Sequence, residues 1–99
     1  MPWSLAELGY FYAQSGRERE AEQVLRELSQ LSKRRYVSPY FLAVVYVGLG
    51  RKEQALSSLE KGYSDRSMFM TLIKVDPELD PLRSEARFVA LLRRMYPEK

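Results

Sequence analysis

Apolar and polar residues recur along this chain at an offset of 34 positions. Within each copy the matched residues are spaced four apart, as on one face of a helix, and a matched glycine separates two such stretches. The matched pairs are Ser4 and Ser38, Leu8 and Leu42, Tyr12 and Tyr46, Gly16 and Gly50, Arg17 and Arg51, Ala21 and Ala55, and Leu25 and Leu59. The pattern predicts two successive helical hairpins of one design.

The ends of these helices carry residues that helix termini favour. Ser38 followed by Pro39 predicts a helix start, because serine caps the first turn and proline suits the first helical position. Ser4 is expected to cap the first helix of the preceding copy in the same way. Gly16 and Gly50 are expected to end the first helix of each hairpin in the left-handed conformation, which glycine adopts without a steric penalty.

Small and large residues are expected to face one another across each hairpin. The small residues, which permit a close approach of the helix axes, are Gly9, Ala21, Ala43 and Ala55. The large residues expected to fill the space between them are Leu8, Tyr12, Leu25, Leu42, Tyr46 and Leu59.

The repeat is lost after Tyr63, and the last third of the chain predicts a different closing structure. A short apolar run from Met68 to Val75 is followed by two Asp-Pro pairs, which predict a turn because a residue before proline avoids the helical region. From about Ser84 a last helix is expected, with one apolar stripe. The stripe consists of Phe88, Leu91, Leu92 and Met95, and Arg87, Arg93 and Arg94 lie beside it. An amphipathic helix of this kind suits the cap of a helical array.

The composition narrows the classes of function. The chain of 99 residues is short enough for a single domain, and its 16 Lys and Arg against 13 Asp and Glu give a net charge of +3. It contains neither Cys nor His, which excludes disulfides, thiolate nucleophiles and imidazole bases. No pair of carboxylates or of Ser and Lys stands at a spacing typical of catalysis, so we predict a non-enzyme without cofactor or metal.

The repeated residues resemble the tetratricopeptide repeat, a helix-turn-helix of 34 residues with Leu-Gly, Tyr, Gly, Ala and a large apolar residue at fixed places. The first copy reads Leu8-Gly9, Tyr12, Gly16, Ala21, Leu25, and the second reads Leu42-Ala43, Tyr46, Gly50, Ala55, Leu59. The resemblance implies an all-α, right-handed solenoid in one domain, residues 1–99. Its parts would be repeat 1 (about 4–35), repeat 2 (about 38–66) and a degenerate cap (67–96) with a short helix and the amphipathic helix.

The stretch from Leu72 to Met95 also resembles the closing segment of such arrays in bacterial regulatory proteins. In those proteins the array follows a DNA-binding, kinase or cyclase domain. The resemblance implies that the chain could be an accessory domain of a larger bacterial signalling or transcription-regulating protein.

In the family fold the first helices of successive repeats line a concave groove. Carried over by the 34-residue offset, this face falls on Ala6, Tyr10, Ala13, Gln14, Tyr40, Val44 and Val47. The resemblance therefore implies a scaffold whose apolar and aromatic groove docks a segment or helix of an unknown protein or peptide. Two alternatives stay open: the groove is closed by the C-terminal segment packed on Tyr40 and Val44, or the chain assembles with itself as a homodimer.

Other sequence features carry weaker signals. The basic run Lys33-Arg34-Arg35 reads as a solvated linker rather than a nucleic-acid site, since three residues neutralise few phosphates. Asp76, Glu78 and Asp80 alternate as in a calcium loop, but the glycine such a loop needs is missing. The longest uncharged stretch, Tyr36 to Gly50, is too short and too interrupted to span a membrane. No export signal is visible, and a cytoplasmic location is expected.

Overall fold

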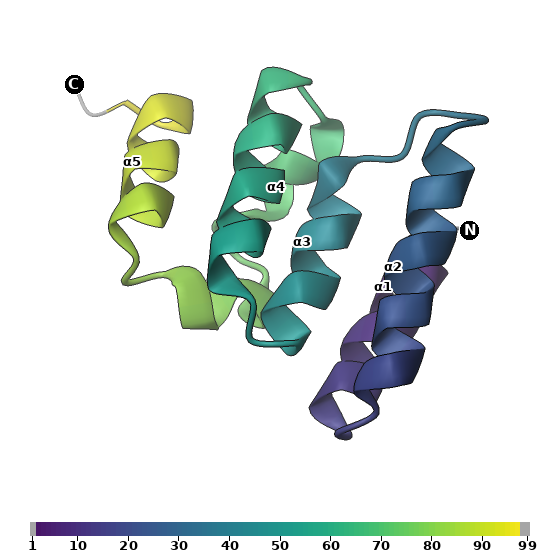
Figure 1. Ribbon diagram of the computed structural model, residues 1–99. Helices are drawn as coiled ribbons and strands as arrows, with labels where there is room; N and C mark the ends of the chain where they lie inside the picture. Colours follow the sequence, from purple (N-terminus) through teal and green to yellow (C-terminus); the bar gives the residue numbers. More distant parts are fainter. Residues whose placement is uncertain (1, 98–99) are drawn as a thin grey trace.

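The computed structural model describes residues 2–97, in which the helices follow one another as a row. The elements are α1 (Pro2–Gln14), α2 (Glu18–Ser32), α3 (Pro39–Gly48), α4 (Lys52–Ser64), the short 3₁₀ helices η1 (Met68–Leu72) and η2 (Pro77–Leu82), and α5 (Ala86–Met95). In Figure 1 the row runs from α1 and α2 on the right, through α3 and α4, to α5 on the left. No strand occurs within residues 2–97, and the all-α helical-repeat architecture is confirmed.

Each hairpin turns at its matched glycine, as predicted. Gly16 and Gly50 have positive φ angles of 78° and 76°. The backbone N–H groups of the residues that follow, Arg17 and Arg51, donate to the carbonyl oxygens of Tyr12 and Tyr46 at 2.8 and 2.9 Å. These bonds satisfy carbonyls that the end of a helix would otherwise leave without a donor.

The two predicted serine caps have different outcomes. Ser38 caps α3: its Oγ accepts a hydrogen bond from the backbone N–H of Tyr40 at 3.2 Å, with Pro39 in the first turn. The prediction for Ser4 was wrong, because α1 already begins at Pro2 and Ser4 lies inside the helix. Proline suits the first turn of a helix, so the helix starts earlier here than the offset from Ser38 suggests.

The two hairpins meet closely where Gly9 of α1 faces α2 and α3. A Cβ atom placed on Gly9 would lie only 2.9 Å from Cγ1 of Val24 and from Cγ2 of Val45. Ala21 and Ala43 are fully buried, in agreement with their expected role as small residues at a close approach. The prediction for the large residues was wrong at Leu8, which is 42% exposed and does not fill the space between the helices. Its counterpart Leu42 is half-buried beside the preceding α2 and linker, and no described element precedes α1.

The C-terminal part differs in detail from the predicted turn and short helix. It forms two 3₁₀ helices in place of one helix, and neither Asp-Pro pair acts only as a turn. Asp76 caps η2, its Oδ1 accepting from the backbone N–H of Glu78 at 3.0 Å, while Pro81 lies inside η2. A 3₁₀ helix accommodates proline in a short piece because few of its N–H groups need partners.

The final helix forms as predicted. Phe88 and Leu91 of α5 are buried, and Leu92 and Met95 pack against the core. Arg87 ties α5 to α4 through its guanidinium, which donates to the carboxylates of Glu53 and Glu60, each at 2.7 Å. With Arg93 and Arg94 exposed on its other side, α5 closes this end of the row.

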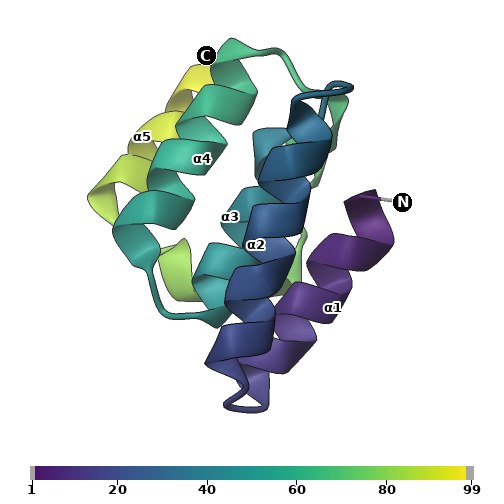
Figure 2. The same ribbon diagram turned by 45° about the vertical axis from the view of Figure 1, so that its right-hand side comes forward.

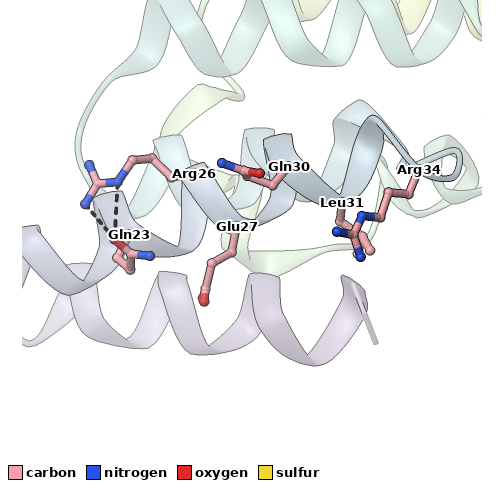
Figure 3. A pocket seen from close by; sticks show the side chains of 6 residues that line it. All are labelled: Gln23, Arg26, Glu27, Gln30, Leu31 and Arg34. Atoms are coloured by element: carbon pink, nitrogen blue, oxygen red, sulfur yellow. Dashed lines mark hydrogen bonds between the residues drawn. The ribbon is translucent and has the colours of Figure 1, made fainter.

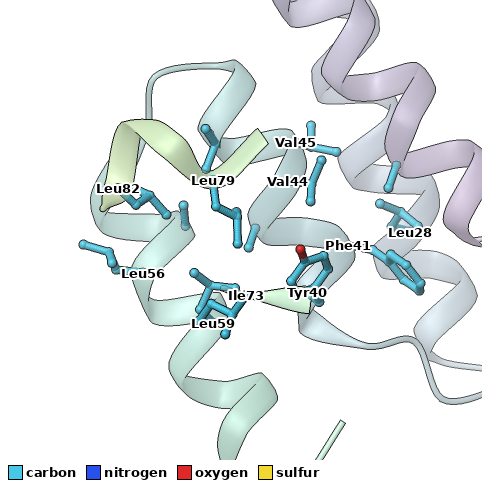
Figure 4. Close-up of a cluster of buried hydrophobic side chains, with 14 of the residues drawn as sticks. Leu28, Tyr40, Phe41, Val44, Val45, Leu56, Leu59, Ile73, Leu79 and Leu82 are labelled. Atoms are coloured by element: carbon cyan, nitrogen blue, oxygen red, sulfur yellow. The ribbon is translucent and has the colours of Figure 1, made fainter. Parts of the chain in front are cut away.

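The core lies between α3, α4 and the C-terminal segment from η1 to η2. Tyr40 of α3, Leu59 of α4, and Ile73 and Leu79 of the C-terminal segment are each 0% exposed and meet at its centre (Figure 4). Figure 2, turned by 45°, shows α1 at the opposite edge of the molecule from α5. The C-terminal segment thus folds back over the second hairpin, which decides how much of the predicted groove stays open.

Candidate functional site

The predicted groove residues divide into a buried and an accessible set. Ala6, Tyr40, Val44 and Val47 are between 0 and 6% exposed. They therefore belong to the core in this structure: the C-terminal segment covers the α3 half of the face, and Ala6 lies on α1, which packs against α3. Tyr10 and Ala13 are half-buried against Gly48 of α3, and Gln14 is exposed at the end of α1. Of the two arrangements that the sequence left open for Tyr40 and Val44, the structure has the closed one.

A partly buried hydrogen bond holds the C-terminal segment over α3. The phenol O–H of Tyr40 donates to Oδ2 of Asp76. Burial, and then this bond to a carboxylate, raise the pKa of Tyr40 far above its usual value of 10, so that the phenol stays protonated and remains a donor. Tyr40 thus acts as an internal support in this structure.

Arg83 fixes the fold of the C-terminal segment itself. Its guanidinium donates to the carbonyl oxygens of Ile73 and Asp76 at 3.1 and 2.8 Å, and to the carboxylate of Asp80 at 2.7 Å. A planar guanidinium with several fixed donors bridges the two 3₁₀ helices in a way that a lysine could not. The segment that covers α3 is therefore held in one conformation by hydrogen bonds of its own.

What stays open on this side is a cleft between α1 and the C-terminal segment, which we name the Trp3 cleft. It has a volume of about 410 Å³ and is lined by Trp3, Glu7, Leu72, Val75, Asp76, Pro77 and Glu78. The ring of Trp3 lies 6.2 Å from the ring of Phe41 and 6.4 Å from that of Phe69, measured between ring centroids. Trp3 is 42% exposed and Val75 is 73% exposed, so apolar surface of both walls faces solvent.

The Trp3 cleft carries acidic groups as well as apolar ones. Burial raises the pKa of Glu78 to about 8, and the neighbouring acidic side chains of Glu7 and Asp76 add to the effect. Burial and the nearby charge of Glu78 also raise the pKa of Tyr10. No Lys or Arg of the described chain lies within 4.0 Å of either glutamate carboxyl group. The carboxyl groups of Glu7 and Glu78, far apart in sequence, thus line one cleft where α1 meets η2.

Sequence reasoning did not predict a binding site at this cleft, although it noted the alternating acidic residues Asp76 and Glu78. Trp3 stands just before the first matched position, and Val75 and Glu78 lie beyond the repeats. One signal was present: the single tryptophan of the chain, a residue type that favours interfaces where an aromatic ring is half in contact with water.

A second hollow of the surface does not place apolar side chains of two separate segments opposite each other, as the Trp3 cleft does. This shallow hollow of about 500 Å³ lies along α2 and the turn that follows it (Figure 3). Gln23, Arg26, Glu27, Gln30 and Leu31 of α2 line it together with Arg34 of the turn. The guanidinium of Arg26 donates to the side-chain oxygen of Gln23 at 2.8 Å, so it already has a partner on the same helix. The basic run Lys33-Arg34-Arg35 is exposed at the end of α2.

Neither a metal-binding group of side chains nor a membrane-spanning helix is found among residues 2–97. No group of three or more Asp and Glu side chains in this range is arranged to hold a metal ion. In the same range, no helix has both the length and the apolar character that crossing a membrane requires.

Comparison with protein families agrees with the geometry of the two hairpins. Two models described as tetratricopeptide repeat match the chain, one over residues 2–27 and the other over residues 40–64. Neither a curated protein nor a solved structure matches the chain. The two matched segments fall on α1–α2 and on α3–α4, and together they cover 26 + 25 = 51 of the 99 residues. The chain belongs to the tetratricopeptide-repeat family. Repeats of this family generally mediate protein–protein interaction and are typically non-catalytic scaffolds.

Proposed function

We propose that this protein is a non-catalytic interaction module that docks a segment of a partner protein in the Trp3 cleft and along the accessible part of α1. The observation that carries the proposal is the half-exposed ring of Trp3, held by Phe41 and Phe69 and facing the exposed Val75. A rigid aromatic ring opposite an aliphatic side chain is a favourable anchor for one apolar side chain of a partner, because little conformational entropy is lost on binding.

The rest of the predicted face extends this anchor. Tyr10, Ala13 and Gln14 continue along α1 from the cleft, and Tyr10 and Ala13 are kept in place by their packing on Gly48. A partner segment following this path would run along α1 from Trp3 toward Gln14. In this proposal the buried residues Tyr40, Val44 and Val47 support the surface from below and do not touch the partner.

The charges at the rim narrow the kind of segment. Glu7, Asp76 and Glu78 all lie among the lining residues, and a cation of the partner would relieve the repulsion between these acidic groups. The preferred segment in this proposal carries an aromatic or aliphatic anchor beside a lysine or arginine.

A displayed library of random peptides tests the proposal, with the folded protein immobilised as bait. We expect enrichment of peptides that combine an apolar anchor with a neighbouring basic residue. Val75→Arg should weaken binding of an enriched peptide by about tenfold or more. The substitution removes an apolar contact and places in the cleft a positive charge, which repels the basic residue of the peptide. The matched control is Met68→Arg, since Met68 is 77% exposed and does not line the cleft.

Equal binding by wild type and Val75→Arg would refute docking in the Trp3 cleft, as would a library that yields no enriched peptide. A role as accessory domain of a larger bacterial regulator and a cytoplasmic location stay predictions from the sequence.

A further inference from the structure

Helix α1 exposes an apolar face that differs from the face lining the Trp3 cleft. Phe11 is 65% exposed and Leu8 is 42% exposed, and with the exposed Ser4 and Ser15 they form one row at helical spacing. Ser15 directly follows α1, and its backbone N–H still donates to the carbonyl oxygen of Phe11 at 3.0 Å. Trp3, Glu7 and Tyr10 lie about 100° away around the same helix. We name the first group the outer row; none of its four residues lines the cleft.

The composition of α1 is that of a covered helix. Among its thirteen residues, Pro2 to Gln14, only Glu7 is charged. The neighbouring α2 has six charged residues in fifteen, whereas the central helix α3 has none in ten. A helix that is apolar on nearly all sides is expected to be buried on nearly all sides. In α1 the outer row remains uncovered, as does Trp3 at the cleft.

The 34-residue offset shows what such a row does when it is covered. The counterpart of Phe11 in α3 is Val45, which is 0% exposed because α1 packs on it at Gly9. The same helix position is therefore a buried helix–helix contact within this chain. At α1 the equivalent contact has no described occupant.

The two ends of the row of helices differ in how far their apolar residues are covered. At the far end α5 buries Phe88 and Leu91 and presents Arg93 and Arg94 to solvent, which is how a helical array is closed. At the near end α1 lies at the edge of the molecule (Figure 2) with Leu8 and Phe11 uncovered. Since the far end is closed by α5, a second copy cannot continue the row by stacking its far end on α1 in the way that α1 stacks on α3. A second copy can cover the near end by presenting its own α1.

We propose that two copies of this chain pair through the outer rows of α1, with the two helices antiparallel about a two-fold axis. The outer row has the order small, large, large, small from Ser4 to Ser15, and this order is the same when read backwards. An antiparallel pair then places Leu8 against Phe11 of the partner subunit at the centre and Ser4 against Ser15 of the partner subunit at each end, as an isologous interface requires. The row holds no charge, so the pairing brings no like charges together. This dimer goes beyond the proposed docking function and leaves the Trp3 cleft free.

The first experiment measures the mass of the protein by light scattering during size-exclusion chromatography, from about 1 µM to about 1 mM. We expect the wild type to pass from 11.6 kDa to twice that mass as concentration rises. Phe11→Asp should stay at the monomer mass throughout, because it buries a charge at the centre of the interface. Met68→Asp, a change at another exposed apolar residue, should dimerise like the wild type. A wild type that remains a monomer at every concentration, or an unaltered dimer of Phe11→Asp, would overturn the proposal.

A second experiment tests the antiparallel register, using the absence of cysteine from the sequence. Ser4 and Ser15 are both exposed, so cysteine at either position should leave the fold intact. A mixture of Ser4→Cys and Ser15→Cys proteins should form disulfide-linked heterodimers under mild oxidation. Ser4→Cys alone should not crosslink, since the two copies of residue 4 would be about 16 Å apart along the paired helices. Rapid crosslinking of Ser4→Cys with itself would contradict the antiparallel arrangement.

Discussion

Replacing Tyr40 with Phe removes one oxygen atom from the centre of the core and leaves the aromatic ring in place. The lost hydroxyl group donates to Asp76, which lies 36 positions further along the chain. Asp76 keeps its second role after the change, since its Oδ1 still accepts from the backbone N–H of Glu78. The substitution therefore isolates the bond that ties α3 to the C-terminal segment.

The expected loss of stability follows from the kind of bond. A hydrogen bond to a charged group contributes about 1.5–3 kcal/mol, and the carboxylate of Asp76 is half-buried, so water reaches it once the phenol is gone. We therefore expect a loss at the lower end, about 1.5 kcal/mol. For a domain of this size, about 1.5 kcal/mol lowers the melting temperature by roughly 6–12 °C. The matched control is Tyr46→Phe in the same helix, for which we expect a change of less than about 0.5 kcal/mol, because its half-exposed ring makes no hydrogen bond among the described residues.

Urea denaturation of both variants measures the free energies of unfolding, and hydrogen exchange shows where the structure opens. In Tyr40→Phe we expect faster amide exchange in η1 and η2 than in α1 and α2, because the lost bond anchors the C-terminal segment. A double-mutant cycle with Asp76→Ala should give a coupling energy of about 1 kcal/mol or more. If Tyr40→Phe were as stable as Tyr46→Phe, or if the two changes in the cycle were additive, the bond would not hold the segment and the reasoning would be refuted.

Three further substitutions test other parts of the structure. Gly9→Ala should destabilise the protein by about 1 kcal/mol in urea denaturation, because crowding against the stiff side chains of Val24 and Val45 outweighs the better helix propensity of alanine; a stabilised variant would contradict the packing. Gly50→Ala should lower stability by about 1 kcal/mol through its positive φ angle alone, since no other atom lies within 4 Å of the added Cβ; an unchanged melting temperature would argue against the left-handed turn. Because the pKa of Glu78 is raised in the folded state, the stability that Glu78 contributes is fully present below the pKa of the unfolded state and is lost as pH rises from about 5 through about 8. Glu78→Gln should flatten this decline in thermal melts across that range, and an equally steep decline would show that the titration of Glu78 is not its cause.

Local features of the fold were predictable because they depend on residues close together in the sequence. The offset of 34 residues placed both hairpins, and the glycines at its turns have the positive φ angles that such turns need. Ser38 caps α3 by accepting a hydrogen bond from the backbone N–H of Tyr40, only two residues away. The apolar stripe of α5 follows from helical spacing alone. The failure at Ser4 has the same basis, since Pro2 offered an equally good start one turn earlier.

The site depended on contacts between distant parts of the chain, which periodicity does not encode. The offset placed Tyr10 and Tyr40 on one face, but the bond from Tyr40 to Asp76 makes one of them core and leaves the other partly accessible. Trp3 became a cleft residue only because Phe69 folds back against it, and Glu7 lines the same cleft as Glu78, which lies 71 positions further along the chain. By itself the sequence determined a tetratricopeptide array with a closing helix, because caps, turns and helical spacing are local. Only the tertiary structure decided which part of its face stays open, because that depends on where the segment after Tyr63 packs.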